Sequence, residues 1–199
     1  MIVVLFVTIL ILLALFKGKF IRKYNSNIYI GVTIFSIIAF ILQDTVKLFD
    51  PFIEGFVGLG FFYVVMLNGA LKDKSKLRIK LSGLRREYSI IGFILITPHA
   101  TKYLLEWLQG DISLPLWGVL GYGIMIPLFI TSFYKIRKKM SRYAWVALQK
   151  LAYLSYIALF IHLIVTADMP NLGIYLVLFV GYFILKIRYE IVKYIRKKK

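Results

Sequence analysis

Cysteine is absent from this chain of 199 residues, and histidine occurs only twice. Without cysteine the chain can form no disulfide framework, no thiolate-held iron–sulfur cluster and no redox-active thiol. The imidazoles of His99 and His162 are therefore its only strong nitrogen ligands for a transition metal. Acidic residues are also scarce, nine against 26 Lys and Arg, and the formal net charge is +17.

Apolar sequence is abundant, because 60% of the residues are hydrophobic and the mean hydropathy is +0.80. A soluble domain of this size cannot bury so much apolar sequence, so we expect an integral membrane protein in contact with the lipid bilayer. Apolar segments near the length needed to cross a bilayer, about 20 residues, occupy approximately 1–16, 28–48, 52–71, 87–108, 115–134, 145–167 and 172–187.

The positive charge is concentrated in alternate connections between these segments. Residues 17–23, 72–86, 135–142 and 186–199 hold 23 of the 26 basic residues. This alternation follows the positive-inside rule and predicts a multi-pass cell-membrane protein with its N-terminus outside and its C-terminus cytoplasmic. The outer connections carry acidic residues instead: Asp50, Glu54, Asp111 and Asp168. We expect the basic residues to contact anionic lipid rather than nucleic acid, because no folded nucleic-acid-binding module is present.

The predicted fold is all-α, a polytopic membrane helical bundle. Residues 1–24 form an N-terminal transmembrane helix and a basic loop, and residues 25–199 form a six-helix haem-binding domain. Segment 1–16 has its basic residues after the apolar run, which is the wrong order for a signal peptide. The glycines at 118, 121 and 123 lie in a spanning segment and favour close helix packing over phosphate binding.

The two histidines are expected at the same depth of the membrane. His99 lies 14 residues after Arg85, and His162 lies 13 residues after Gln149, on helices that both run from inside to outside. At the helical rise each interval covers about 20 Å. If Arg85 and Gln149 share one level, the two imidazoles share another in the outer half. Ionisable residues at membrane depth usually have a partner or a function, so the pair suggests axial ligation of one haem.

The neighbours of the histidines fit a flat ligand. Ala158 and Ser155 precede His162 by one and two turns, Gly92 lies two turns before His99, and small residues leave room for a macrocycle. Lys102 and Tyr103 lie one turn outward of His99, where Lys102 can pair with a haem propionate. The alternative is that each histidine merely hydrogen-bonds to a neighbouring helix.

At these residues the chain resembles the ferric reductase-like transmembrane domain family. It is most similar to the family's haem-binding membrane subunits of periplasmic methionine sulfoxide reductase systems (the MsrQ/YedZ group). The resemblance covers roughly residues 82–163. It is carried, in order, by Arg85-Arg86-Glu87, His99 with Tyr103, Pro127 to Ser132, Trp145 with Leu148 and Gln149, Tyr153, and His162.

The resemblance implies a six-helix core, here with one extra N-terminal helix, that carries b-type haem and moves electrons across a membrane. Family members place histidine where this chain has Gln149, and glutamine is a poor iron ligand. We therefore expect one haem b, in the outer leaflet. Arg85, Arg142 and Gln149 would then line an inner site for the electron donor, a quinone or a flavin.

Two further readings compete with this electron-transfer subunit, whose acceptor would be an extracytoplasmic reductase, ferric iron or a flavoprotein. The first is a non-redox membrane protein, such as a small transporter or assembly factor, in which the histidines are structural. The second is a haem carrier or sensor with exchangeable haem. The chain has no acid–base constellation of its own, so any oxidoreductase chemistry would belong to the haem and a redox partner.

Overall fold

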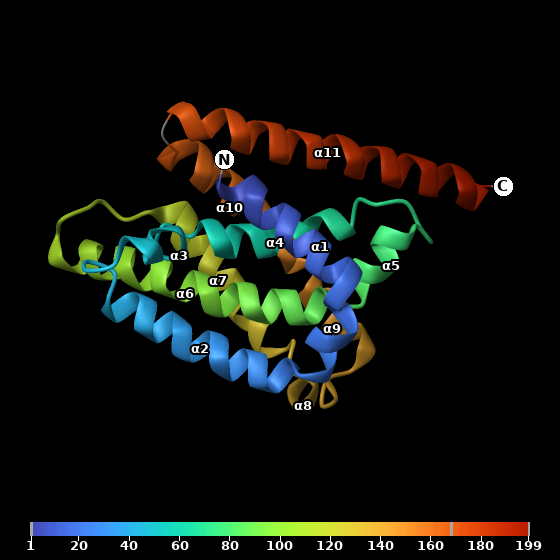
Figure 1. Cartoon of the computed structure of the whole chain (residues 1–199). Coiled ribbons are helices and arrows are strands. Elements are labelled where there is room, and N and C mark those ends of the chain that lie inside the picture. The colour runs from blue at the N-terminus through green and yellow to red at the C-terminus, as the bar shows by residue number, and fades with distance from the viewer. Residues whose placement is uncertain (1, 168, 199) are drawn as a thin grey trace.

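The computed structural model describes residues 2–167 and 169–198, and every regular element in this part of the chain is a helix (Figure 1). Asp168, expected in an outer connection, lies outside the described residues. The elements are α1 (Ile2–Lys23), α2 (Asn25–Ile41), a short 3-10 helix η1 (Lys47–Phe49), α3 (Asp50–Ile53), α4 (Phe56–Asn68), α5 (Lys76–Ser82), α6 (Arg85–Gln109), α7 (Leu116–Ile130), α8 (Tyr134–Arg137), α9 (Arg142–Gln149), α10 (Leu151–Thr166) and α11 (Met169–Lys198).

Three helical stretches of the described chain are long and apolar enough to cross a membrane. They are α1, the α9–α10 stretch (Arg142–Thr166) and the Leu172–Arg196 part of α11. The bent pair formed by Lys47–Ile53 and Phe56–Asn68 would make a fourth, while α2 and α7 are shorter apolar helices. These helices agree with the expected membrane protein, and the seven-span topology stays a prediction.

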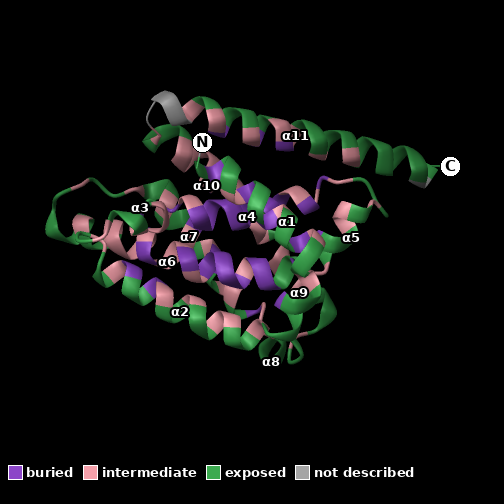
Figure 2. Ribbon diagram, viewed as in Figure 1, coloured by how far each residue is buried: buried purple, intermediate pink, exposed green. Residues whose placement is uncertain are grey.

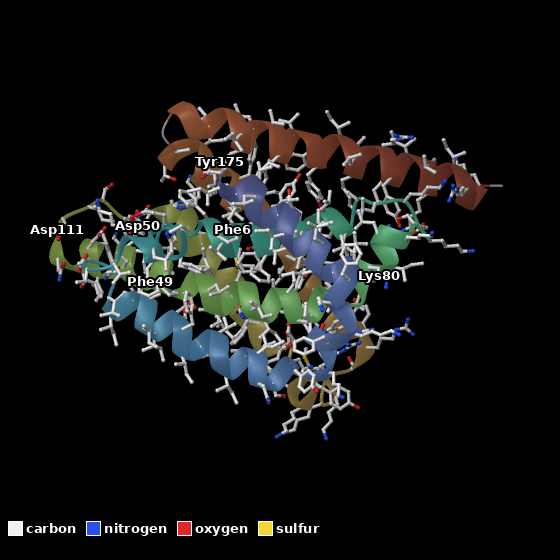
Figure 3. All side chains as sticks on the ribbon, in the orientation of Figure 1. Phe6, Phe49, Asp50, Lys80, Asp111 and Tyr175 are labelled. Carbon is white, nitrogen blue, oxygen red and sulfur yellow. The ribbon has the colours of Figure 1, made fainter. Side chains whose placement is uncertain are left out.

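Charged residues of the two kinds of connection lie at opposite ends of the molecule. Asp50 and Asp111, from two connections expected outside, lie at one end, and Lys80, from a basic cluster, lies at the other (Figure 3). The long helices run between these ends (Figure 1). This arrangement is what the alternation of charges along the sequence predicts.

Helix α1 is longer and more integrated than the sequence suggested. It continues to Lys23, so residues 17–23, expected as a loop, are helical. The Tyr88 hydroxyl of α6 donates to the Leu10 carbonyl oxygen at 2.7 Å. On α4, a Cβ atom at Gly60 would lie 3.2 Å from the Cβ of Phe6. Helix α1 therefore shares one core with other helices of the described chain.

One of the expected apolar segments is sharply bent, and a second is irregular at a single residue. Segment 52–71 bends by 40° between α3 and α4, where Gly55 has φ +79°, a left-handed conformation that glycine adopts without strain. Segment 145–167 changes from α9 to α10 at Lys150. Short turn geometries of this kind leave little trace in hydropathy, which reports only apolar content.

The core is centred on α4 and the first half of α6, where buried residues are densest (Figure 2). Helix α6 packs on α4 and α2, whereas α10 packs chiefly on α7. Hydrogen bonds from Ser36 to the Ile94 carbonyl (2.9 Å) and from Tyr63 to the Leu178 carbonyl (3.0 Å) tie α2 and α11 to this centre. The candidate site lies among α4, α6, α7 and α10. Of these helices, α4 packs on α6, α6 on α7, and α7 on α10.

Candidate functional site

The two histidines lie side by side although their helices pack on different partners. The ring centroids of His99, on α6, and His162, on α10, are 6.3 Å apart, and the ring planes make an angle of 74°. Both residues are half-buried. The juxtaposition predicted from the spacing of the sequence is therefore present.

His99 is held from behind by the break between α3 and α4. Its Nδ1 lies 3.0 Å from the carbonyl oxygen of Ile53. In the tautomer that carries the proton on Nδ1, this nitrogen donates to the carbonyl and Nε2 keeps a free lone pair. Metal-binding histidines are usually oriented in this way, through a hydrogen bond from the second ring nitrogen.

A glycine lies against each imidazole. A Cβ atom on Gly55 would lie 3.1 Å from Cγ of His99, and one on Gly118 would lie 3.1 Å from Cε1 of His162. Both distances are shorter than ordinary van der Waals contact, so a side chain at either glycine would push the ring away. Gly118, expected to serve helix packing, thus also makes room for a histidine.

Glu54 lies beside Lys102 and Tyr103 at the end of the site away from the basic connections. The sequence placed it in an expected outer connection but not in the site. Its carboxylate accepts a hydrogen bond from the Tyr103 hydroxyl (3.2 Å) and lies 3.4 Å from Lys102 Nζ. The Tyr103 ring meets His99 edge-on, with centroids 4.8 Å apart. The Lys102–Glu54 pair is partly exposed, and such pairs contribute little free energy. The proposed pairing of Lys102 with a propionate stays a prediction.

Ser155 and Ala158 are buried against α7. The Ser155 hydroxyl donates to the Gly121 carbonyl oxygen at 3.2 Å, and a Cβ on Gly121 would lie 3.6 Å from that of Ala158. Gly92 similarly faces α4, since its Cβ would lie 2.7 Å from the Cβ of Phe61. These small residues bring helices together, and a role of Ser155 and Ala158 beside a macrocycle stays a prediction.

Arg85 and Gln149 both line a cavity of about 50 Å³ towards the basic end of the bundle. Residues of α4, α6, α7, α9 and α10 line it, including the polar side chains of Ser89, Ser132, Ser155 and Tyr156. Arg142, which the sequence grouped with this site, is not among the lining residues. A cavity of this volume has room for water molecules but not for a quinol or flavin ring. Binding of such a donor would require the lining side chains to move, and it stays a prediction.

Aromatic rings connect the level of this cavity with the level of the histidines. Phe93 stacks on Tyr122 (centroids 5.1 Å apart) and on Phe129 (4.3 Å). Phe93 and Phe129 line the cavity, while the Tyr122 hydroxyl lies 3.0 Å from Thr97 Oγ1, two residues before His99. The stack packs aromatic side chains between α6 and α7.

The histidine pair suits a metal that brings other ligands with it. Within the described residues, no three His, Cys, Asp or Glu side chains cluster in a way that could hold a bare metal ion. A haem would bring most of the iron's ligands with it, and His99 and His162 would then suffice to hold it. Two metal–nitrogen bonds of about 2 Å, together with the radii of two imidazoles, place ring centroids roughly 6 Å apart. The observed centroid distance of 6.3 Å agrees with this spacing, and a haem between the two rings stays a prediction.

Comparisons with known proteins give no functional name. No protein-family model matches the chain, and no solved structure matches it. An uncharacterized protein of Treponema pallidum (strain Nichols) is 28% identical over an alignment of 203 positions, which covers 85% of this chain and 55% of that protein. The chain therefore spans about half the length of the curated relative that it matches.

Proposed function

We propose that this chain is a b-type haem-binding membrane subunit that transfers electrons across the bilayer. The donor is a quinol or reduced flavin on the side of the basic connections. The acceptor, on the opposite side, is a reductase, a flavoprotein or ferric iron. The observation that carries the proposal is the distance of 6.3 Å between the His99 and His162 rings. The resemblance of residues 82–163 to ferric reductase-like membrane domains supports it.

In this proposal each part of the site has a task. His99 and His162 would hold the haem iron, and the Ile53 carbonyl orients His99. Haem supplies reversible one-electron chemistry at the iron, with a potential that its axial ligands help to set. The stack of Phe93, Tyr122 and Phe129 excludes water between the two levels.

The two ends of the site differ in charge. At the inner cavity, Arg85 and Gln149 offer donors to the carbonyl or anionic group of an electron donor. At the outer end, Glu54 lies beside Lys102 and Tyr103, close to where an acceptor would approach His99. Electrons would thus enter beside a guanidinium group and leave beside the Glu54–Lys102 ion pair.

A second candidate is a non-redox membrane protein, such as a small transporter or assembly factor, with structural histidines. The contact between His99 Nδ1 and the Ile53 carbonyl oxygen favours it, because that contact joins α6 to the α3–α4 break without any cofactor. This hypothesis does not explain why His162 lies beside His99.

An absorption spectrum of the purified protein before and after dithionite separates the two candidates. The electron-transfer proposal expects the sharp alpha band of a reduced low-spin b haem, and its appearance when menaquinol or reduced flavin replaces dithionite. A protein that is purified from haem-sufficient cells without haem, and that takes up none on titration, would support the second candidate.

A further inference from the structure

An apolar groove of about 440 Å³ lies between α1 and α2, away from the histidines. The two helices meet at Tyr24 and diverge from there, with α6 between them (Figure 1). Buried side chains of α4 and α6 form the floor of the groove, namely Phe61, Tyr88, Ile91 and Leu95. Because the Tyr88 hydroxyl already donates to the Leu10 carbonyl oxygen, the floor presents an apolar surface.

One face of α1 forms the length of the groove. Leu10, Leu13, Lys17 and Ile21 line it, at spacings of three or four residues that place them along one side of the helix. The distance along the axis from Leu10 to Ile21 is about 16 Å at the helical rise. This is close to half of the roughly 30 Å hydrocarbon thickness of a bilayer, which is the depth of one leaflet.

Lys17 is the charged residue of the lining and lies towards the basic end of α1. It is exposed, and no carboxylate of the described chain forms an ion pair with it. A lysine near the end of a membrane helix extends its ammonium group towards the headgroup layer while its stem stays among apolar groups. Lys17 therefore offers an unpaired positive charge beside an apolar channel one leaflet deep.

We propose that this groove binds the acyl chain of one phospholipid with an anionic headgroup, and that Lys17 contacts its phosphate. The apolar lining suits an acyl chain in polarity and length, and the positive ammonium group of Lys17 complements the negative charge of the headgroup. An occupant is also favoured on packing grounds, because atoms lining an empty groove lose their dispersion contacts. Anionic lipids of the leaflet next to the basic connections are the available molecules of this chemistry.

Thermal unfolding of the full chain in neutral detergent tests the headgroup. Dioleoylphosphatidylglycerol should raise the Tm more than an equal amount of dioleoylphosphatidylcholine, and soluble glycerol phosphate should not raise it. Lys17→Gln should weaken binding of the anionic lipid about fivefold, the effect of one lysine at a headgroup. Lys17→Arg should keep the preference, which separates loss of charge from misfolding.

Lys19→Gln is the matched control, because Lys19 lies in the same basic end of α1 but does not line the groove. It should retain the preference for the anionic lipid. Equal Tm values in the two lipids would overturn the proposal. An equal loss of affinity for the anionic lipid in Lys17→Gln and Lys19→Gln would also overturn it. So would a rise in Tm with glycerol phosphate as large as the rise with the lipid.

Quenching by brominated acyl chains tests the tail. Val32 lines the groove from α2, whereas Ile30 on the same helix is 62% exposed and lies outside the lining. The added fluorescence of Val32→Trp should be quenched at about one anionic lipid per protein, and that of Ile30→Trp only in lipid excess. Quenching of both at the same lipid ratio would show ordinary annular contact and overturn the proposal.

Discussion

Nδ1 of His99 lies 3.0 Å from the carbonyl oxygen of Ile53, so a backbone group at the break between α3 and α4 orients a side chain of α6. The break exists because Gly55 adopts φ +79° immediately after Glu54. A continuous helix over 52–71 would keep the Ile53 carbonyl in its own ladder. The turn therefore has a direct role in fixing one member of the histidine pair.

Gly55→Ala should lower both stability and haem affinity. The left-handed conformation costs a residue with a Cβ atom roughly 1–2 kcal/mol, and that Cβ would press on His99 at 3.1 Å. Loss of an orienting contact of this kind typically lowers metal affinity by roughly tenfold or more. Haem titration and chemical unfolding measure the two effects.

Gly110→Ala is the control for backbone strain. Gly110 has φ +85°, and nothing lies within 4 Å of the Cβ position. It should lose similar stability while keeping its haem affinity. If the two variants bind haem equally well, Gly55 has no role beyond its turn.

Gly118→Ala should perturb the other imidazole. The new methyl group would lie 3.1 Å from Cε1 of His162, and the ring must tilt or the helices separate. We expect roughly tenfold weaker haem binding and a broadened alpha band. Gly123→Ala on the same helix meets nothing within 4 Å and should leave haem binding unchanged. Identical spectra for the two variants would show that Gly118 does not position His162.

Replacing Arg85 with Gln and Gln149 with Leu together should slow haem reduction by menaquinol or reduced flavin, because both side chains line the inner cavity. Haem content should stay unchanged, since the cavity lies away from the histidines. Arg142→Gln serves as the comparison, because Arg142 does not line the cavity. Stopped-flow absorbance gives the rates, and a double variant reduced as fast as the unmodified chain by every donor would contradict this site.

The topology can be tested with single cysteines because the chain has none of its own. A membrane-impermeant maleimide added outside should label Asp111→Cys and leave Ser75→Cys unlabelled. Permeabilising the membrane should expose both. Labelling of Ser75→Cys in intact cells would contradict the predicted orientation.

Much of the helical organisation could be predicted because hydrophobic and basic residues alternate over the whole chain. The extent of α1 could not be predicted, because hydropathy reports only its apolar part. Lys and Arg are good helix formers and continue the helix beyond that part to Lys23. The bend at Gly55 was also missed. Glycine is common in membrane helices, so its presence alone does not distinguish a turn from close packing.

Part of the candidate site could likewise be predicted from the sequence, and part could not. The pairing of His99 with His162 followed from equal spacing along two helices of the same direction. The Ile53 carbonyl carries no sequence signal, because every residue has a backbone acceptor. Glu54 could have been found from its place in an outer connection opposite Lys102, but the contact depends on the fold of a different helix.

The most direct measurement of the central claim is the reduced-minus-oxidised spectrum of His99→Ala and His162→Ala beside that of the unmodified chain. We predict a low-spin b-type alpha band in the unmodified chain and its loss in each variant, because a single remaining imidazole would not give a low-spin haem with two histidine ligands. Gln149→Ala, which alters the inner cavity only, should keep the band. A full low-spin spectrum in both histidine variants would contradict the ligand assignment.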